Sequence, residues 1–132
     1  YGEKLPAPVR VEYDTRSPGD AGGDLSAFWL SDPSNYGSGY LFGFGSNGNT
    51  CNKLLIEGAE VITAPRPVVT PGKWHHVIMQ VLADGRAQLI VDDQLSLDYK
   101  GPAPGAPKFP GLWTWGLEGV FAKVRIYRGG AQ

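Results

Sequence analysis

The pair Asp84-Gly85 stands between two runs of alternating apolar and polar residues, and it constrains the fold more than any other feature of the sequence. One run covers residues 74–82 and the other covers residues 86–91, with Ala83 just before the pair. Asp-Gly between two such runs is among the strongest short signals for a tight hairpin turn. The sequence therefore predicts an antiparallel β-hairpin here.

The rest of the chain repeats the same pattern of short strands and turns. No run of about 10–12 residues combines helical apolar spacing with few glycines and prolines, so we predict almost no helix. Turn signals recur about every 8–12 residues, which is typical of a β-sandwich. A proline-rich loop is expected over residues 101–111. The expected strands are residues 9–14, 25–30, 40–44, 53–57, 60–63, 74–82, 86–91, 94–99, 112–115 and 120–127.

The composition agrees with a folded domain that has many turns. The 132 residues include 19 glycines and 11 prolines, which is about twice the usual share of these two residues. Aromatic residues make up 11% and hydrophobic residues 42%, a content that disordered chains lack. A chain of this length buries about two-thirds of its unfolded surface. We therefore expect residues 1–132 to form a single domain.

Charge and hydropathy exclude two classes of partner. The formal net charge is -1, and the basic residues are scattered among acidic ones, whereas a nucleic-acid-binding protein usually shows a basic stripe. No stretch reaches the roughly 18 apolar residues of a membrane span. Cys51 is the single cysteine, so no internal disulfide can form. We expect neither a nucleic-acid partner nor a membrane span.

Two stretches resemble a known superfamily. Residues 72–95 read GKWHHVIMQVLADGRAQLIVDDQL, and residues 124–127 read VRIY. They are similar to a Trp-His-His-Val strand, a glycine-containing hairpin and the closing strand of the concanavalin A-like lectin/glucanase superfamily, in particular its laminin G-like domains. The wider strand pattern resembles bacterial 3-keto-disaccharide hydrolase-like domains. Asp93 stands where the family has a glycine.

The resemblance implies an all-β fold, namely an antiparallel jelly-roll β-sandwich of the concanavalin A-like type. Members often bind glycans on the concave sheet or on rim loops. The resemblance also implies that Trp74 is a core tryptophan. Many calcium-binding members carry acidic residues just before the closing strand, where this chain has Phe121, Ala122 and Lys123. An ammonium group cannot be a ligand of a hard cation, so we expect no metal and no cofactor.

Catalytic arrangements are weak in the sequence. Glu57 and Glu60 form the best close pair of carboxylates, but they flank a predicted turn, where charged side chains usually stay exposed. His75 and His76 are adjacent, so on a strand they face opposite ways and cannot both ligate one metal. We expect no catalytic residue, although an enzyme that uses these groups stays open as an alternative.

Aromatic side chains carry the binding hypothesis. Trp113 and Trp115 alternate with smaller neighbours and share one face of a strand. Flat aromatic rings stack on the apolar face of a sugar ring, while amide and guanidinium groups bond its hydroxyls; core packing is the alternative explanation. Asn47, Asn49 and Asn52 cluster by a turn and can line the same rim or shape that turn. The candidate sugar-binding residues are Trp29, Tyr40, Asn49, Arg66, Trp113 and Trp115.

The favoured hypothesis is a non-catalytic carbohydrate-binding or adhesion module within a larger protein, located outside the cell or in the cell envelope. Its partner would be a glycan or polysaccharide, together with other domains or subunits of the parent protein. One alternative is a domain that cleaves glycosides or 3-keto-glycosides. The other is a structural interaction domain, whose exposed aromatic residues contact protein instead of sugar.

Overall fold

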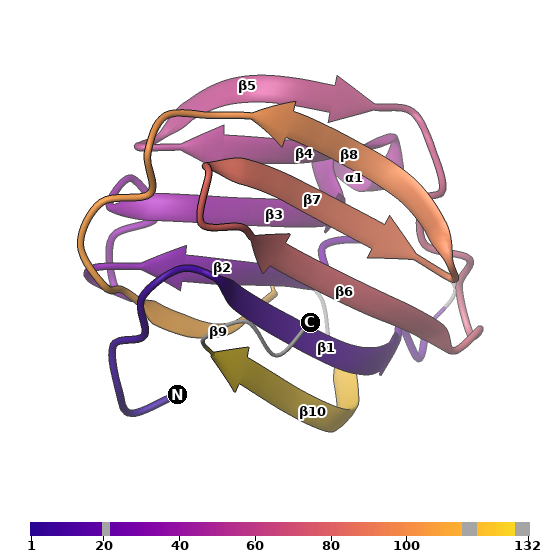
Figure 1. The fold of residues 1–132 in the computed structure, drawn as a ribbon. Helices are drawn as coiled ribbons and strands as arrows, with labels where there is room; N and C mark the ends of the chain where they lie inside the picture. The colour runs from indigo at the N-terminus through magenta and orange to yellow at the C-terminus, as the bar shows by residue number, and fades with distance from the viewer. Residues whose placement is uncertain (20–21, 115–118, 129–132) are drawn as a thin grey trace.

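The computed structural model describes residues 1–19, 22–114 and 119–128, which form two antiparallel five-stranded sheets packed face to face (Figure 1). We call them the β1 sheet and the β3 sheet. The β1 sheet has the strand order β10 (Val120–Arg128), β1 (Val9–Arg16), β6 (His75–Val81), β7 (Arg86–Val91) and β8 (Gln94–Lys100). The β3 sheet has the order β5 (Ala59–Ala64), β4 (Cys51–Ile56), β3 (Gly39–Gly45), β2 (Ser26–Leu30) and β9 (Phe109–Trp113).

The core lies between the two sheets and follows the two-residue period of the strands. On β1, Val9, Val11 and Tyr13 are fully buried, while Arg10 and Asp14 are on the other face. The β3 sheet contributes large aromatic side chains, and burying each of them stabilises the fold by about 1.5–3 kcal/mol. The largest of these side chains are Trp29, Tyr40, Phe42 and Phe44.

The strands expected from the sequence are present, including the Asp84-Gly85 hairpin. It joins β6 to β7, and Gly85 has a φ of 95°, a value that favours glycine. The main difference concerns β9, which begins at Phe109, inside the segment expected to be a proline-rich loop. Pro110 is tolerated there because β9 is an edge strand that pairs only with β2.

Trp74 corrects one expectation. Its side chain is 46% exposed just before β6, so the resemblance was wrong in implying a core tryptophan. The guanidinium of Arg16 lies 5.3 Å from its ring centre. The tryptophan that does occupy the core is Trp29, whose indole N–H donates to the carbonyl oxygen of Leu5 at 2.9 Å.

Asn52 joins the two sheets beside the turn that follows β3. Its buried amide nitrogen donates to Ser96 Oγ on β8 at 2.8 Å and to the carbonyl oxygen of Pro67 at 2.6 Å. Its Oδ1 accepts from the backbone N–H of Gly45 at 3.0 Å. The end of β3 is thereby fixed to the opposite sheet. A four-residue helical turn, α1 (Ser46–Asn49), is the helix within the described residues, and no helix there could span a membrane.

Candidate functional site

A pocket of about 650 Å³ lies on the outer face of the β3 sheet, over strands β3 and β4. Tyr40, Phe42 and Phe44 point into the core, so the alternate residues Leu41 and Gly43 face outward. Register pairs Leu41 with Leu55 and Gly43 with Lys53 on β4. The floor therefore has a glycine at its centre, and the hydroxyl of Ser46 occupies the space where a side chain of residue 43 would lie.

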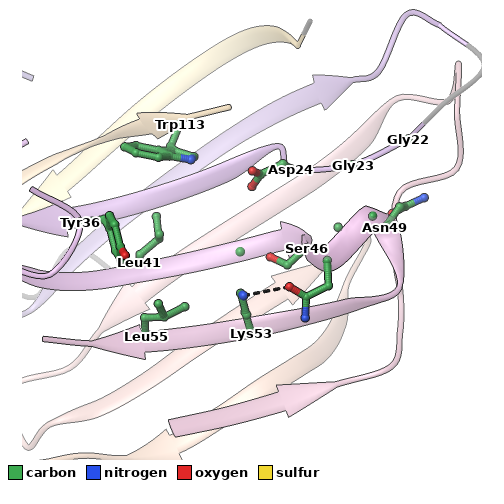
Figure 2. Close-up of a pocket in the computed structure, with 14 residues that line it drawn as sticks. Gly22, Gly23, Asp24, Tyr36, Leu41, Ser46, Asn49, Lys53, Leu55 and Trp113 are labelled. Atoms are coloured by element: carbon green, nitrogen blue, oxygen red, sulfur yellow. Dashed lines mark hydrogen bonds between the residues drawn. The ribbon is translucent and has the colours of Figure 1, made fainter. Parts of the chain in front are cut away.

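Polar side chains and aromatic rings surround this floor. Figure 2 shows Trp113 above the opening, Tyr36 at its left, Asp24 and Ser46 at its right and Lys53 below it. These residues come from β9, from the loop between β2 and β3, from the segment before β2, from α1 and from β4. The fold therefore gathers chemically different groups from five segments around one opening.

The wall beside α1 is made of backbone in the left-handed region. Asp24 has a φ of 48°, Asn47 of 53° and Asn49 of 65°. Asp and Asn are the non-glycine residues that accept this conformation most readily. Gly45, with a φ of 77°, lies between them, and a Cβ there would sit within 3 Å of Gly23, Asn49 and Val69. The close approach of these segments shapes the end of the pocket.

Asp24 places a half-buried carboxylate on this wall. Its backbone N–H donates to the carbonyl oxygen of Gly45 at 2.9 Å, and Ser26 Oγ donates to its Oδ1 at 2.7 Å. Burial raises the pKa of Asp24 above its usual range, although the hydrogen bond from Ser26 and the charge of Lys53 act in the opposite direction.

Lys53 supplies the cation of the pocket. Its ammonium group donates to Asn47 Oδ1 at 3.1 Å, which orients it along the pocket wall (Figure 2). The ion pairs found among the described residues do not include one between Lys53 and Asp24. The Asp24 carboxylate and the Lys53 ammonium lie on different sides of the same opening (Figure 2), and the charge of Lys53 acts to lower the pKa of Asp24, which burial raises.

Two residues expected to bind sugar lie at this pocket. Trp113 lines it, and so does Asn49. Both polar atoms of the Asn49 amide are occupied, since Nδ2 donates to the carbonyl oxygen of Val69 at 2.7 Å and Oδ1 accepts from the Val69 N–H at 2.9 Å. Asn49 therefore holds the pocket wall together.

Other expected residues lie elsewhere. Trp29 and Tyr40 are 0% and 2% exposed, with ring centres 5.3 Å apart in the core, so neither has a free face for stacking on a sugar. Residues 25–30 are apolar on both faces of their strand, so the sequence does not tell which face points into the core, and tertiary packing determines it. Arg66 is exposed in the segment after β5, outside the residues that line the pocket. Trp115 lies outside the described residues.

The candidate catalytic groups do not converge. Glu57 is exposed at the turn between β4 and β5, and Glu60 is exposed near the start of β5. His75 is buried and its Nδ1 lies 2.7 Å from Asp92 Oδ2, whereas His76 lies on the outer face of the β1 sheet. Within residues 1–19, 22–114 and 119–128, no group of three His, Cys, Asp or Glu side chains could hold a metal ion.

The site residues expected from the sequence leave out most of the residues that line the pocket. Asp24, Tyr36, Gly43 and Lys53 come from separate segments and form no motif together. A partial signal exists at Gly43, because a glycine inside a strand often marks a close approach of a ligand or another backbone. Asn47 was noted from the turn composition, and it does line the pocket.

Comparison with solved structures supports the fold. No family model matches the sequence, and no curated protein does. Carbohydrate-binding module CBM66 from Bacillus subtilis superposes with a TM-score of 0.67 at 17% identity, covering 92% of this chain and 75% of that one. A double variant of human galectin-16 gives 0.67 at 12% identity, covering 96% and 92% of the two chains.

A Bacillus licheniformis beta-glucanase also superposes, with a TM-score of 0.57, 12% identity and coverage of 98% of this chain and 57% of that one. Two antiparallel sheets packed face to face define the molecule as a jelly-roll β-sandwich. More particularly, the fold is of the concanavalin A-like type, as the sequence resemblance implied.

Proposed function

We propose that the chain is a lectin-like domain that binds carbohydrate in the pocket over Gly43. The observation that carries the proposal is the meeting of an aromatic ring, a carboxylate and an ammonium group around one opening. Two of the structural neighbours described above are a carbohydrate-binding module and a galectin by name, which supports the same class of ligand.

Sugar chemistry suits this set of groups. A sugar hydroxyl both donates and accepts hydrogen bonds, so it can donate to the Asp24 carboxylate or accept from the Lys53 ammonium. The apolar face of the ring can stack on Trp113 or Tyr36. The pocket volume of about 650 Å³ also lies within the roughly 300–1,000 Å³ usual for small-ligand sites.

The proposed role is binding without catalysis. Glycoside hydrolysis ordinarily needs two carboxyl groups about 5–10 Å apart across the scissile bond. Among the described residues that line the pocket, Asp24 is the one carboxylic acid. As part of the same proposal, the domain serves a larger protein outside the cell or in the cell envelope, where polysaccharides are accessible.

A glycan array with the wild-type chain, followed by titration calorimetry on the best hits, tests the proposal. Trp113→Ala should weaken binding about tenfold or more, since it removes the stacking surface. Trp74→Ala is the matched control, because Trp74 is exposed but does not line the pocket. A wild-type chain that binds no glycan, or equal losses in the two variants, would contradict the proposal.

A further inference from the structure

We propose that the pocket selects an uncharged sugar with two adjacent free hydroxyl groups, one donating to Asp24 and the other accepting from Lys53. This inference rests on the proposed function, and it adds the ligand class and the two residues that determine specificity. It follows from where these two charged groups lie and from the hydrogen bonds that each of them makes.

The Asp24 carboxylate can accept further hydrogen bonds. It is half-buried, and the side-chain hydrogen bond it accepts from a described residue comes from Ser26 Oγ. An ionised carboxylate offers about four acceptor positions. A half-buried carboxylate with unused acceptor positions is costly, so a ligand that supplies O–H donors at this wall gains a charge-assisted hydrogen bond.

The Lys53 ammonium group can donate further hydrogen bonds. An ammonium group carries three N–H donors. One of them is directed to Asn47 Oδ1 at 3.1 Å, and this contact fixes the ammonium group beside the floor of the pocket. A ligand group that reaches this point must accept a hydrogen bond.

The floor of the pocket lies between these two charged groups. Gly43 pairs with Lys53 across β3 and β4, and a Cβ at Gly43 would collide with Ser46 Oγ and lie 3.4 Å from Lys53 Cγ. Glycine therefore leaves room for the Ser46 hydroxyl on the floor, and the edge of a sugar ring that lies over this floor can reach both charged groups. Neighbouring hydroxyls on such an edge can satisfy donor and acceptor demands at the same time.

The charge balance then disfavours ionic sugars. Lys53 pairs with Gly43, and Asp24 is hydrogen-bonded to Gly45 two residues further along the same strand, so both charges border one stretch of β3. A charged ligand group there would meet one attractive and one repulsive partner. A uronic acid whose carboxylate faces Lys53 also lies near the like charge of Asp24, and an amino sugar whose ammonium faces Asp24 also lies near the like charge of Lys53. A neutral pair of hydroxyls avoids both conflicts.

Binding of defined monosaccharides tests this inference. The probes are the methyl glycosides of glucose, galactose and mannose, their singly deoxygenated analogues, the corresponding glucuronide and galacturonide, and methyl glucosaminide. We expect a neutral glycoside to bind, and loss of either hydroxyl of one adjacent pair to weaken it about tenfold or more. The charged analogues should bind more weakly than the neutral parent.

Two variants identify which hydroxyl of the sugar contacts Asp24 and which contacts Lys53. Asp24→Asn and Lys53→Met should each weaken the neutral parent about tenfold, and each should remove the penalty for deleting the hydroxyl that its residue contacts. Lys123→Met is the control, because Lys123 lies on β10 in the other sheet and is exposed. Thermal melting verifies that each variant is folded.

The outcomes separate the two proposals. If the wild-type chain binds no sugar, both fail. If it binds and depends on Trp113, while deoxygenated or charged analogues bind as well as the parent or Asp24→Asn has no effect, the inference fails and the proposed function stands.

Discussion

At the scale of single residues, Asp24 combines a role in the pocket with a cost to the fold. Burial raises its pKa above the value in the unfolded chain. A raised carboxyl pKa means that the folded state binds the proton more tightly, so ionisation at neutral pH favours unfolding. The side chain is retained at a backbone φ of 48°, beside the pocket.

Replacing the charge should therefore separate stability from binding. Asp24→Asn keeps an oxygen that can accept from Ser26 Oγ, and it removes the half-buried charge. We expect an equal or higher Tm at pH 7, by up to about 3 °C, together with loss of sugar affinity. The stability gain should vanish on acidification, since Asp24 itself becomes neutral there. A large drop in Tm at pH 7 would show that the charge supports the fold.

Tryptophans illustrate how far single residues are predictable. Trp29 and Trp113 both lie in strands expected from the sequence, yet one is fully buried and the other lines a pocket. Alternation tells which residues share a face, and only the pairing of strands tells which face is covered. The sequence did not predict a shared site for Asp24 and Lys53 for a related reason. The pairing of β2, β3 and β4 brings both residues to the same pocket.

At the scale of elements, strands β1 and β6 are joined on their outer face by a cluster of charges. His76 lies between two acids, with Nδ1 2.7 Å from Asp14 Oδ1 and Nε2 2.7 Å from Glu12 Oε2. Arg10 donates to the other oxygen of Glu12 at 2.7 Å. The hydrogen bond to Asp14 raises the pKa of His76 despite its burial.

The sign of the pH effect follows from these shifts. A raised histidine pKa stabilises the fold fully below the unfolded value of about 6.5, and this contribution is lost as pH rises through the folded pKa. Burial raises the pKa of Glu12, but its hydrogen bonds and the charges of Arg10 and His76 lower it below 4.5 overall. The stabilisation by Glu12 is present above about 4.5 and is lost as pH falls through the folded pKa.

We therefore expect His76→Gln to destabilise the chain most at about pH 5–6, and less at pH 8–9. The loss should be about 1 kcal/mol or less, because the side chain is 39% exposed and such pairs are screened by solvent. Chemical denaturation of both proteins across this range measures the difference. A difference that grows toward pH 9 would contradict the assignment.

The elements themselves were largely predictable. Strands such as β1, β7 and β8 carry alternating apolar and polar residues and lie next to proline, glycine or aspartate, and such local signals do not depend on distant contacts. The start of β9 was missed because prolines surround it, and Pro110 is acceptable only at the edge of a sheet. The sequence does not reveal which strand will be at an edge.

At the scale of the whole molecule, the two sheets are coupled by polar contacts as well as by the core. The buried Asn52 reaches from β4 to Ser96 on β8, and it also accepts from the N–H of Gly45 at the end of β3. Asn52→Ala should lower the free energy of unfolding by about 2–4 kcal/mol, because these buried groups lose their partners. Equilibrium denaturation measures the loss.

Asn35→Ala is the control for that measurement. Asn35 is exposed in the loop between β2 and β3, and its Oδ1 accepts from the backbone N–H of Gly37. We expect a loss of about 1 kcal/mol or less. A similar loss in the two variants would mean that Asn52 does not couple the sheets. Sugar affinity should also fall in Asn52→Ala, since Gly45 lines the pocket.

Strand β3 gives this molecule an unusual freedom to change. Tyr40, Phe42 and Phe44 belong to the interior, while Leu41 and Gly43 between them belong to the pocket. A mutation at Leu41 leaves the first set untouched, because neighbouring side chains lie on opposite sides of the sheet. A side chain at residue 43 would have to displace the Ser46 hydroxyl, which also lines the pocket. Ligand preference can therefore diverge within a lineage, or be diversified in a library, on a scaffold whose interior stays constant.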